Sequence, residues 1–351
     1  MKILYVITGL GGGGAEKVVS GLADEMLKLG HQVKIAYLKG EVVVHPENNE
    51  IELCNLGLES IIYSKAAYKN YKQLLREFQP DVIHAHMVHA NIFARISRIF
   101  FPIPKLICTA HNANEGGKLR MLAYKYTDKL SDLNTNVSFE ATEAFVKMNA
   151  FNANSIPIYN GIDLNKFKFH LNKEKNKIIQ MIAIGRLNQQ KDYPNLLHAL
   201  NLIKEKQICF KLSIVGEGEE RENLENLIDY YNLNDSVELL GRRNNISDLL
   251  QNKDIFILSS AFEGFGLVVA EAMASNVFTI ATDCGGVKEV MGGTGILVPP
   301  KNSYQLADAI LEAIEMDNKQ ILENNVTAYN HVKKNFDLKV IVEKWLEIYA
   351  S

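Results

Sequence analysis

The sequence predicts an α/β protein made of two doubly wound parallel-sheet domains in tandem. Short apolar segments alternate with amphipathic ones, and this alternation stops at one polar stretch and then restarts. The length of 351 residues suits two domains of roughly 150 residues each. A ligand cleft is therefore expected where the carboxyl ends of the two sheets face each other.

The first domain, expected over residues 1–167, opens with a buried strand and an amphipathic helix. Gly30 supplies the stop signal of that helix. Pro80 precedes a short apolar strand, and Pro102 ends the helix that follows it. The expected strands are 2–8, 32–38, 81–85 and 106–110, and the expected helices are 15–29 and 89–100.

The stretch 168–177 is polar and lacks an apolar period, so it is interpreted as the linker. The second domain is expected over residues 178–335. Residues 336–351 are expected to form a last helix, over 337–350, that carries Trp345 and packs back on the N-terminal domain. The expected strands are 178–184, 209–215, 237–240, 255–259 and 278–282, and the expected helices are 193–206, 219–231, 246–252, 266–274 and 304–314.

Composition excludes several classes of protein. Hydrophobic residues make up 47% and charged residues 23%, as in soluble globular chains. The four cysteines form no CxxC pair, which indicates a reducing compartment and neither a zinc site nor a disulfide framework. No apolar run approaches the roughly 18 residues of a membrane helix, and the N-terminal MKILYVITGL lacks a signal-peptide pattern. A net charge of -3 disfavours a nucleic-acid partner.

The charge is unevenly distributed. Residues 61–130 carry eleven Lys/Arg against four Asp/Glu, whereas residues 175–335 carry sixteen against twenty-one. The first half is locally basic and the second acidic. Within the basic region, residues 117–130 alternate cations with apolar side chains, a pattern typical of binding to an anionic membrane surface or of an ordinary solvated helix face.

A glycine run, Gly9 to Gly14, follows the first strand and matches G-x-G-x-x-G by letter. A nicotinamide or flavin site would also need an acid at the end of the second strand, but none occurs before Glu41. A flexible turn is a further interpretation. The favoured one is a loop whose backbone N–H groups approach a diphosphate, next to the positive end of a helix dipole.

Two carboxylates frame the most informative segment, residues 263–271. Glu263 follows a strand, and Glu271 lies inside the next helix among apolar neighbours. The N–H groups near residues 265–268 offer an anion site between them, and carboxylates accept hydrogen bonds from sugar hydroxyls. The alternative is a helix cap and a solvated helix residue, which is unattractive for Glu271 in so apolar a helix.

Two cations are expected at the same sheet edge. Arg186 follows the first strand of the second domain, and Lys191 precedes its first helix. Such a pair suits a departing diphosphate, whose negative charge grows in the transition state. Taken singly, each cation is equally well interpreted as a surface residue.

The two expected domains carry eight short motifs. They are G-R-L-x-x-x-K (185–191), V-G-E-G-E-E-R (215–221), E-G-F-G-L-V-V-A-E (263–271), G-G-V-K-E-V (285–290), G-I-L-V-P-P (295–300), P-D-V-I-H-A-H (80–86), T-A-H-N (109–112) and I-P-I-Y-N-G-I-D (156–163). In these motifs and their order, the chain resembles the retaining glycosyltransferases of family 4, of the bacterial surface-polysaccharide type. The resemblance covers nearly the whole chain and implies a GT-B fold, with two Rossmann-like domains facing across a cleft.

The resemblance also implies roles for single residues. Glu271 holds the ribose hydroxyls and Glu263 contacts and orients the donor sugar. Arg186 and Lys191 neutralise the diphosphate, and His111 approaches the reacting carbon. The catalytic set is thus Glu263, His111, Arg186 and Lys191, and the donor-binding set is Glu271, Gly12, Gly13, Gly14, Gly264, Phe265, Gly266, Leu267 and Asn160.

The expected function is retaining transfer of a hexosyl or N-acetylhexosaminyl group from a nucleotide diphosphate sugar, UDP-linked or GDP-linked. The acceptor expected from the resemblance is a lipid-linked oligosaccharide of O-antigen, capsule or related glycan synthesis, bound by the N-terminal domain at the inner face of the cytoplasmic membrane. A nucleotide-sugar epimerase of related architecture and a non-catalytic nucleotide-sugar-binding subunit are the alternatives.

No cofactor or metal is expected. The chain has no Asp-x-Asp, the pair through which many glycosyltransferases bind Mg²⁺. His84, His86 and His89 lack a nearby third acidic or cysteine ligand, so cleft-lining or buried histidines are favoured over a metal cluster. Cations and helix dipoles then supply the electrostatic stabilisation.

Overall fold

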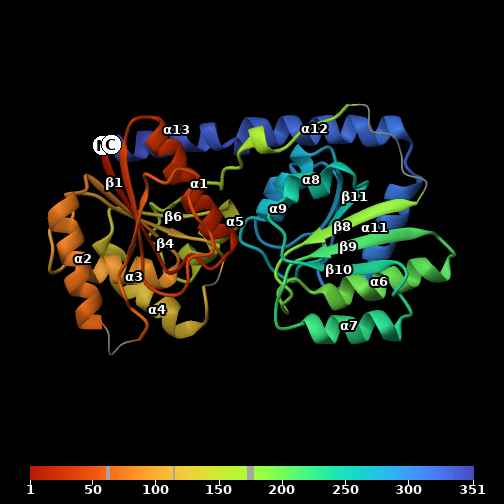
Figure 1. The fold of residues 1–351 in the computed structure, drawn as a ribbon, viewed down its shortest axis with the longest axis horizontal. Helices are drawn as coiled ribbons and strands as arrows, with labels where there is room; N and C mark the ends of the chain where they lie inside the picture. Colours follow the sequence, from red (N-terminus) through yellow and green to blue (C-terminus); the bar gives the residue numbers. More distant parts are fainter. Residues whose placement is uncertain (61–63, 114, 172–177) are drawn as a thin grey trace. The chain divides into compact units, whose positions relative to one another are not determined.

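The computed structural model describes residues 1–60, 64–113, 115–171 and 178–351. The chain divides into two compact units, each an α/β domain (Figure 1). The first unit contains Met1–Gly161 together with Leu338–Ser351, and the second contains Ile162–Asp337. The last helix therefore belongs to the first unit. The part of the chain that the structure describes contains no helix long and apolar enough to cross a membrane.

The division lies a few residues away from the boundaries expected at 167 and 336. The Ile162 N–H donates to the Phe336 carbonyl over 2.8 Å, and Ile162 bridges to Asp337, so both segments join the second unit. Residues 168–171 of the expected linker also belong to this unit, where the Asn276 side chain donates to the His170 carbonyl. Residues 172–177 of the expected linker lie outside the described residues.

The first unit contains a seven-stranded sheet in the order β3-β2-β1-β4-β5-β6-β7, with all pairs parallel. Its strands are β1 (Lys2–Ile7), β2 (Gln32–Tyr37), β3 (Glu52–Asn55), β4 (Val82–His86), β5 (Leu106–Ala110), β6 (Leu133–Asn136) and β7 (Ile156–Pro157). Its α-helices are α1 (Gly14–Lys28), α2 (Ser64–Phe78), α3 (Val88–Ser97), α4 (Lys118–Thr127), α5 (Phe139–Lys147) and α13 (Leu338–Ala350).

Successive side chains along each strand point to opposite faces of this sheet, so they pack in two separate cores. Leu4 and Val6 of β1 pack in one apolar cluster with Tyr71 of α2 and Phe93 of α3. On the opposite face, Tyr5 accepts a hydrogen bond from Tyr349 of α13. Helices thus cover both faces of the first sheet, which leaves the ends of its strands to carry polar residues.

The second unit contains a six-stranded parallel sheet in the order β10-β9-β8-β11-β12-β13. Its strands are β8 (Ile179–Ile184), β9 (Phe210–Val215), β10 (Val237–Gly241), β11 (Ile255–Leu258), β12 (Phe278–Thr282) and β13 (Ile296–Val298). Its α-helices are α6 (Tyr193–Glu205), α7 (Arg221–Tyr230), α8 (Ile246–Gln251), α9 (Leu267–Ala274), α10 (Val287–Met291), α11 (Ser303–Glu315) and α12 (Asn318–Phe336).

Helix α12 is absent from the sequence prediction. Only four of its nineteen residues are buried, so its apolar stripe is too narrow to dominate the local pattern. Two signals were available. Asp317 and Gln320 form a reciprocal capping box, and the buried residues recur every three or four positions. These buried residues are Asn325, Ala328, Val332 and Phe336.

Candidate active site

The candidate site of the second unit lies at the carboxyl ends of three neighbouring strands. Strand β11 pairs with β8 on one side and with β12 on the other, all in parallel. The loop after β8 carries Arg186 and Lys191, the loop after β11 carries Glu263, and the turn after β12 carries Gly285. Since parallel strands end at the same edge, the topology brings these residues to one place.

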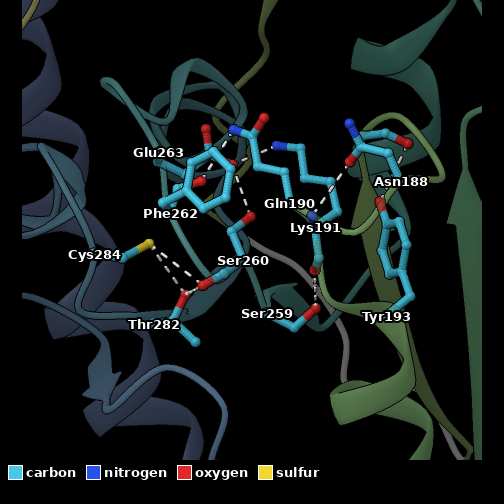
Figure 2. A network of polar contacts seen from close by, with 11 residues as sticks. Asn188, Gln190, Lys191, Tyr193, Ser259, Ser260, Phe262, Glu263, Thr282 and Cys284 are labelled. Atoms are coloured by element: carbon cyan, nitrogen blue, oxygen red, sulfur yellow. Dashed lines mark hydrogen bonds and ion pairs between the residues drawn. The ribbon is translucent and has the colours of Figure 1, made fainter. Parts of the chain in front are cut away.

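Lys191 and Glu263 form an ion pair at this edge (Figure 2). Lys191 Nζ lies 2.5 Å from Glu263 Oε1, and only 15% and 10% of the two side chains are exposed. Ser260 Oγ donates to the same oxygen over 2.7 Å. Among the described residues no donor is hydrogen-bonded to Glu263 Oε2, so this oxygen is available to accept a hydrogen bond from a substrate hydroxyl.

Further hydrogen bonds hold the Lys191 loop against the Glu263 loop. Ser259 Oγ donates to the Lys191 carbonyl over 2.8 Å. The Gln190 side chain donates to the Phe262 carbonyl over 3.0 Å, and the Ala261 N–H donates to the Gln190 carbonyl over 2.8 Å (Figure 2). The ion pair is therefore fixed by the backbones of both loops as well as by its own attraction.

The turn after β12 supports the Glu263 loop from the other side. Thr282 Oγ1 donates to the Ser260 carbonyl over 2.6 Å. Gly285 has φ +56°, and a Cβ on it would lie 1.8 Å from the Glu263 carbonyl oxygen. Only glycine allows the two backbones to approach this closely, which explains Gly285, the first glycine of the 285–290 motif.

Glu271 projects from α9, which starts directly after the Glu263 loop. Gly266 precedes the helix in the left-handed region, with φ +85°, so the chain turns sharply from the loop into the helix. Only 6% of Glu271 is exposed, which excludes the solvated helix residue that the sequence left open. Phe265 is buried and packs edge-on against Phe336 of α12 at 5.2 Å between ring centroids.

Arg186 differs from Lys191 in its surroundings. Its side chain is exposed, and the described residues give it no ion-pair partner. The two predicted cations are therefore not equivalent. Lys191 is bound to Glu263, whereas the Arg186 guanidinium is free to bind an anion through its planar fork of donors.

The first unit places His111 at the carboxyl end of β5. Its Nε2 lies 3.1 Å from Nδ1 of His86, the last residue of the neighbouring strand β4. The His111 backbone N–H donates to Glu115 Oε1 over 2.7 Å. Burial lowers the pKa of His111 to about 4 and raises the pKa of Glu115 to about 7. At neutral pH the His111 imidazole is therefore uncharged.

His84 and His86 are buried side by side, with ring centroids 4.0 Å apart. His84 Nδ1 is hydrogen-bonded to the Tyr349 hydroxyl at 2.6 Å, and its Nε2 to Thr109 Oγ1 at 2.7 Å. Burial holds the pKa of both imidazoles well below the ordinary value. The described residues contain no group of three or more metal-ligating side chains placed to hold an ion.

The glycine run after β1 ends at α1, whose N-cap is Gly13. The buried carboxylate of Glu16 lies against this loop, because a Cβ on Gly13 would stand 2.6 Å from Glu16 Oε2. A carboxylate thus occupies the neighbourhood of the helix N-terminus, where its charge is favourable to the helix dipole. Asn160, the remaining predicted donor-binding residue, is buried next to the end of the first unit.

A solved structure with the same architecture as the whole chain is that of Anabaena Alr3699/HepE in complex with UDP and glucose. The two chains superpose with a TM-score of 0.88, at 22% identity, over 100% of both chains. The family model described as Glycosyl transferases group 1 matches residues 162–330, and that described as Glycosyltransferase Family 4 matches residues 12–166. The chain belongs to the GT-B glycosyltransferases.

Named relatives of this glycosyltransferase extend over the full chain. The amylovoran biosynthesis glycosyltransferase AmsD of Erwinia amylovora is 26% identical over 357 residues, which is 99% of either chain. A Campylobacter jejuni enzyme is 27% identical over 369 residues, covering 100% of this chain and 99% of its own. Its name is GalNAc-alpha-(1->4)-GalNAc-alpha-(1->3)-diNAcBac-PP-undecaprenol alpha-1,4-N-acetyl-D-galactosaminyltransferase.

The structure brings together part of the site that the sequence predicts. The structure pairs Glu263 with Lys191 and places Glu271 on the helix that follows. It places His111, Gly12, Gly13, Gly14 and Asn160 in the first unit.

Ser260 and Glu115 were missed. Ser260 comes directly after the expected strand 255–259. Its position at the carboxyl end of a parallel strand indicates a site residue. Glu115 lies in a polar loop without periodicity, where nothing marked it.

Proposed function

We propose that this glycosyltransferase moves a hexosyl or N-acetylhexosaminyl group from a nucleotide diphosphate sugar, preferably UDP-linked, to a sugar hydroxyl of a lipid-linked oligosaccharide. The anomeric configuration of the moved sugar is retained. The observation that carries the proposal is the ion pair of Glu263 and Lys191, which leaves Glu263 Oε2 available beside the N-terminal end of α9. A carboxylate so fixed orients a sugar hydroxyl without losing rotamer freedom at the moment of binding.

In this proposal the second unit binds the donor. The buried Glu271 accepts hydrogen bonds from the vicinal ribose hydroxyls. The exposed Arg186 binds diphosphate oxygens, assisted by Lys191 and by backbone N–H groups near Gly264, Phe265, Gly266 and Leu267. The Gly12, Gly13 and Gly14 backbone and Asn160 contribute further donor contacts from the first unit. The relative with UDP and glucose in its structure supports a UDP-sugar.

In this proposal the sugar is transferred in one step, without a covalent enzyme intermediate. The bond between the anomeric carbon and the diphosphate oxygen breaks, and a bond from that carbon to the acceptor oxygen forms on the same face. The acceptor hydroxyl gives its proton to the departing diphosphate. Arg186 and Lys191 stabilise the negative charge that grows on this leaving group. His111, uncharged at neutral pH, contacts the donor sugar near the reacting carbon.

Neither a metal nor a cofactor is required in this proposal, because the cations and helix N-terminus at the diphosphate site supply the electrostatic stabilisation. Turnover is expected to remain unchanged after EDTA treatment and gel filtration, and to gain nothing from added Mg²⁺ or Mn²⁺. A loss of activity that added metal restores would contradict this part.

The acceptor and the membrane surface are assigned to the first unit. Helix α4 exposes 83% of Leu119 and 80% of Tyr126, with Leu122 between them at helical spacing. Exposed Lys118 and Lys125 accompany this apolar stripe. A basic helix with such a stripe suits an anionic lipid surface at the inner face of the cytoplasmic membrane. A relative whose name includes PP-undecaprenol, and one named for amylovoran biosynthesis, support a lipid-linked acceptor in polysaccharide synthesis.

Flotation with liposomes tests the membrane surface. Wild-type protein is expected to float with vesicles that contain anionic phosphatidylglycerol and to stay behind with neutral phosphatidylcholine vesicles. Replacing Leu119 and Tyr126 by Ser should reduce flotation about tenfold, because two exposed apolar anchors are lost. Tyr230→Ser, which removes an aromatic residue 76% exposed on the second unit, is the control. Equal flotation of all three proteins would contradict the assignment.

A screen of UDP- and GDP-sugars with a short-chain polyprenyl diphosphate oligosaccharide tests the reaction. Acceptor-dependent release of nucleotide diphosphate, with the new linkage assigned by NMR, is the expected result. A new sugar epimer formed without acceptor would point to an epimerase instead. Binding of a nucleotide sugar without turnover of any kind would point to a non-catalytic subunit.

A further inference from the structure

The half-buried carboxyl group of Glu115 joins the His111 loop to helix α4 in the first unit. We propose that Glu115 is a positioning residue of the glycosyltransferase, which fixes the backbone at His111 and so sets where the imidazole stands relative to the donor sugar. The proposal rests on the proposed function, because that function gives His111 its contact with the donor. Glu115 itself touches His111 and Tyr124 and is assigned no contact with substrate.

Two donors converge on the two oxygens of the Glu115 carboxylate. The His111 N–H donates to Oε1 over 2.7 Å, and the Tyr124 hydroxyl donates to Oε2 over 2.5 Å. Each oxygen of a carboxyl group can accept such a hydrogen bond. Since one carboxylate takes both, the backbone at the end of β5 and the side chain from α4 hold each other in place.

Tyr124 is itself fixed from several directions. It is fully buried, and its hydroxyl accepts a hydrogen bond from Asn91 Nδ2 over 2.9 Å. The Arg95 guanidinium lies over its ring, 5.1 Å from the centroid. Tyr124 also packs edge-on against Phe145 at 5.3 Å. Tyr124 is thus held in the core by several contacts, so its hydrogen bond to Glu115 fixes the position of the Glu115 carboxyl group and of the loop attached to it.

The same network reaches the loop from its other side. Asn91 Nδ2 donates to the Thr109 carbonyl over 2.9 Å as well as to Tyr124. The two attachment points, at Thr109 and at the His111 N–H, flank Ala110, the last residue of β5. His111 therefore leaves the sheet with its backbone held on both sides, and its imidazole stands at the His86 ring.

A double-mutant cycle tests the proposal in the full-length protein. Glu115→Ala is expected to lower kcat about tenfold, since small displacements at a reacting centre are costly. In the His111→Ala background the same change should lower kcat by less than about twofold, because its effect passes through His111. An equal loss in both backgrounds would overturn the proposal, since it would show a general structural effect.

Two readouts that do not need turnover keep the test decisive. Hydrogen exchange at the His111 amide should accelerate in Glu115→Ala and recover in Glu115→Gln, whose amide oxygen still accepts from that N–H. The dissociation constant for UDP should change by less than about threefold in Glu115→Ala, because Arg186 and Glu271 lie in the second unit. Unchanged exchange in Glu115→Ala would overturn the contact.

These experiments distinguish failure of the Glu115 proposal from failure of the proposed function. Wild-type protein that transfers no sugar from any nucleotide donor would overturn the function and with it a role at the donor. Normal transfer with an additive cycle would overturn only the positioning role of Glu115. Glu115→Gln should recover part of kcat, and a Gln variant as slow as the Ala variant while its amide exchange is restored would also contradict positioning through the His111 backbone.

Discussion

Lys191 Nζ lies 2.5 Å from Glu263 Oε1, and both side chains are largely withdrawn from water. This ion pair joins a loop after β8 to a loop after β11, 72 positions apart in the sequence. It neutralises two charges that would each be expensive to leave unpaired in such surroundings. It also orders the Glu263 carboxylate so that one oxygen faces the protein and the other is available to a ligand.

Breaking this pair should destabilise the second unit. Lys191→Met or Glu263→Gln alone is expected to lower its free energy of unfolding by about 2 kcal/mol, below the range for a fully buried pair because both groups keep some exposure. The double variant should cost less than the sum of the two single changes, since no unpaired charge remains. Urea unfolding followed by circular dichroism measures this. Strictly additive losses would show that the two side chains do not interact.

Tryptophan fluorescence supplies an internal control for that experiment. The chain has one tryptophan, and Trp345 is buried in the first unit, on α13. Its unfolding transition should therefore stay within experimental error in all three variants, while the transition of the second unit moves.

Ser260 should affect turnover more than stability. Ser260→Ala removes the 2.7 Å hydrogen bond to Glu263 Oε1, which leaves Lys191 as the one hydrogen-bond donor to that oxygen among the described residues. We expect kcat to fall about tenfold, with a loss of roughly 1 kcal/mol in stability. Ser303→Ala is the matched control, because Ser303 bonds with His198 on α6 and has no part in the site. Wild-type kcat in Ser260→Ala would count against an ordering role.

Gly285→Ala should disrupt the site through its backbone. The new Cβ would lie 1.8 Å from the Glu263 carbonyl oxygen, and φ is +56°, so the Glu263 loop must move. We expect loss of nearly all turnover and a marked fall in the melting temperature of the second unit. Gly293→Ala is the control for strain alone, because Gly293 has φ +82° with open space around it and should cost only about 1 kcal/mol. Equal effects of both changes would contradict the close approach.

The stability of the first unit should depend on pH through two groups, Glu115 and His111, with opposite signs. Burial raises the pKa of Glu115 from 4.5 to about 7, so the folded state favours the protonated carboxyl group. The free energy of unfolding gained in this way is lost as pH rises from about 4.5 through about 7. Burial lowers the pKa of His111 from 6.5 to about 4, so stability is lost as pH falls through that window. Arg120, Arg95 and Tyr124 are the other charged or titratable groups that face Glu115, and they remain unchanged in the test.

Glu115→Gln separates these contributions. The stability of the variant relative to wild type should increase as pH rises from about 5 to 8, because only wild type then loses the Glu115 contribution. Urea unfolding of the first unit, followed by Trp345 fluorescence at pH 5, 6, 7 and 8, measures the difference. Parallel stability curves for the two proteins would show that Glu115 does not titrate in this range.

The sequence predicted the elements whose patterns are strong and local. Apolar segments between glycines and prolines marked most strands that form the middle of each sheet, and the 263–271 motif placed Glu263 and Glu271 on a loop and its helix. The short strands β3, β6, β7 and β13 went unpredicted. They have only two to four residues, too few for a period to show, and their pairing depends on neighbours distant in sequence.

The supporting contacts of the site depend on tertiary structure. Lys191 was predicted to face a diphosphate, but its pairing with Glu263 depends on where two parallel strands end. Gly285 was visible as part of a motif, but its contact with the Glu263 backbone required the positions of both loops. Glu115 and Tyr124 lie nine positions apart, and only the turn before α4 brings them together. The residue types in the sequence therefore indicate which interactions each side chain can make, whereas the partners of each side chain depend on the topology of the fold.

The most direct test of the central claim is acceptor-dependent sugar transfer by wild type, Glu263→Ala and Arg186→Ala, with circular dichroism confirming the fold of each. Wild type should transfer the sugar with retention, and both variants should lose about a hundredfold or more in kcat/KM, since each removes a contact at the donor. Wild-type rates in both folded variants would contradict the assignment of the donor site to this edge of the second sheet.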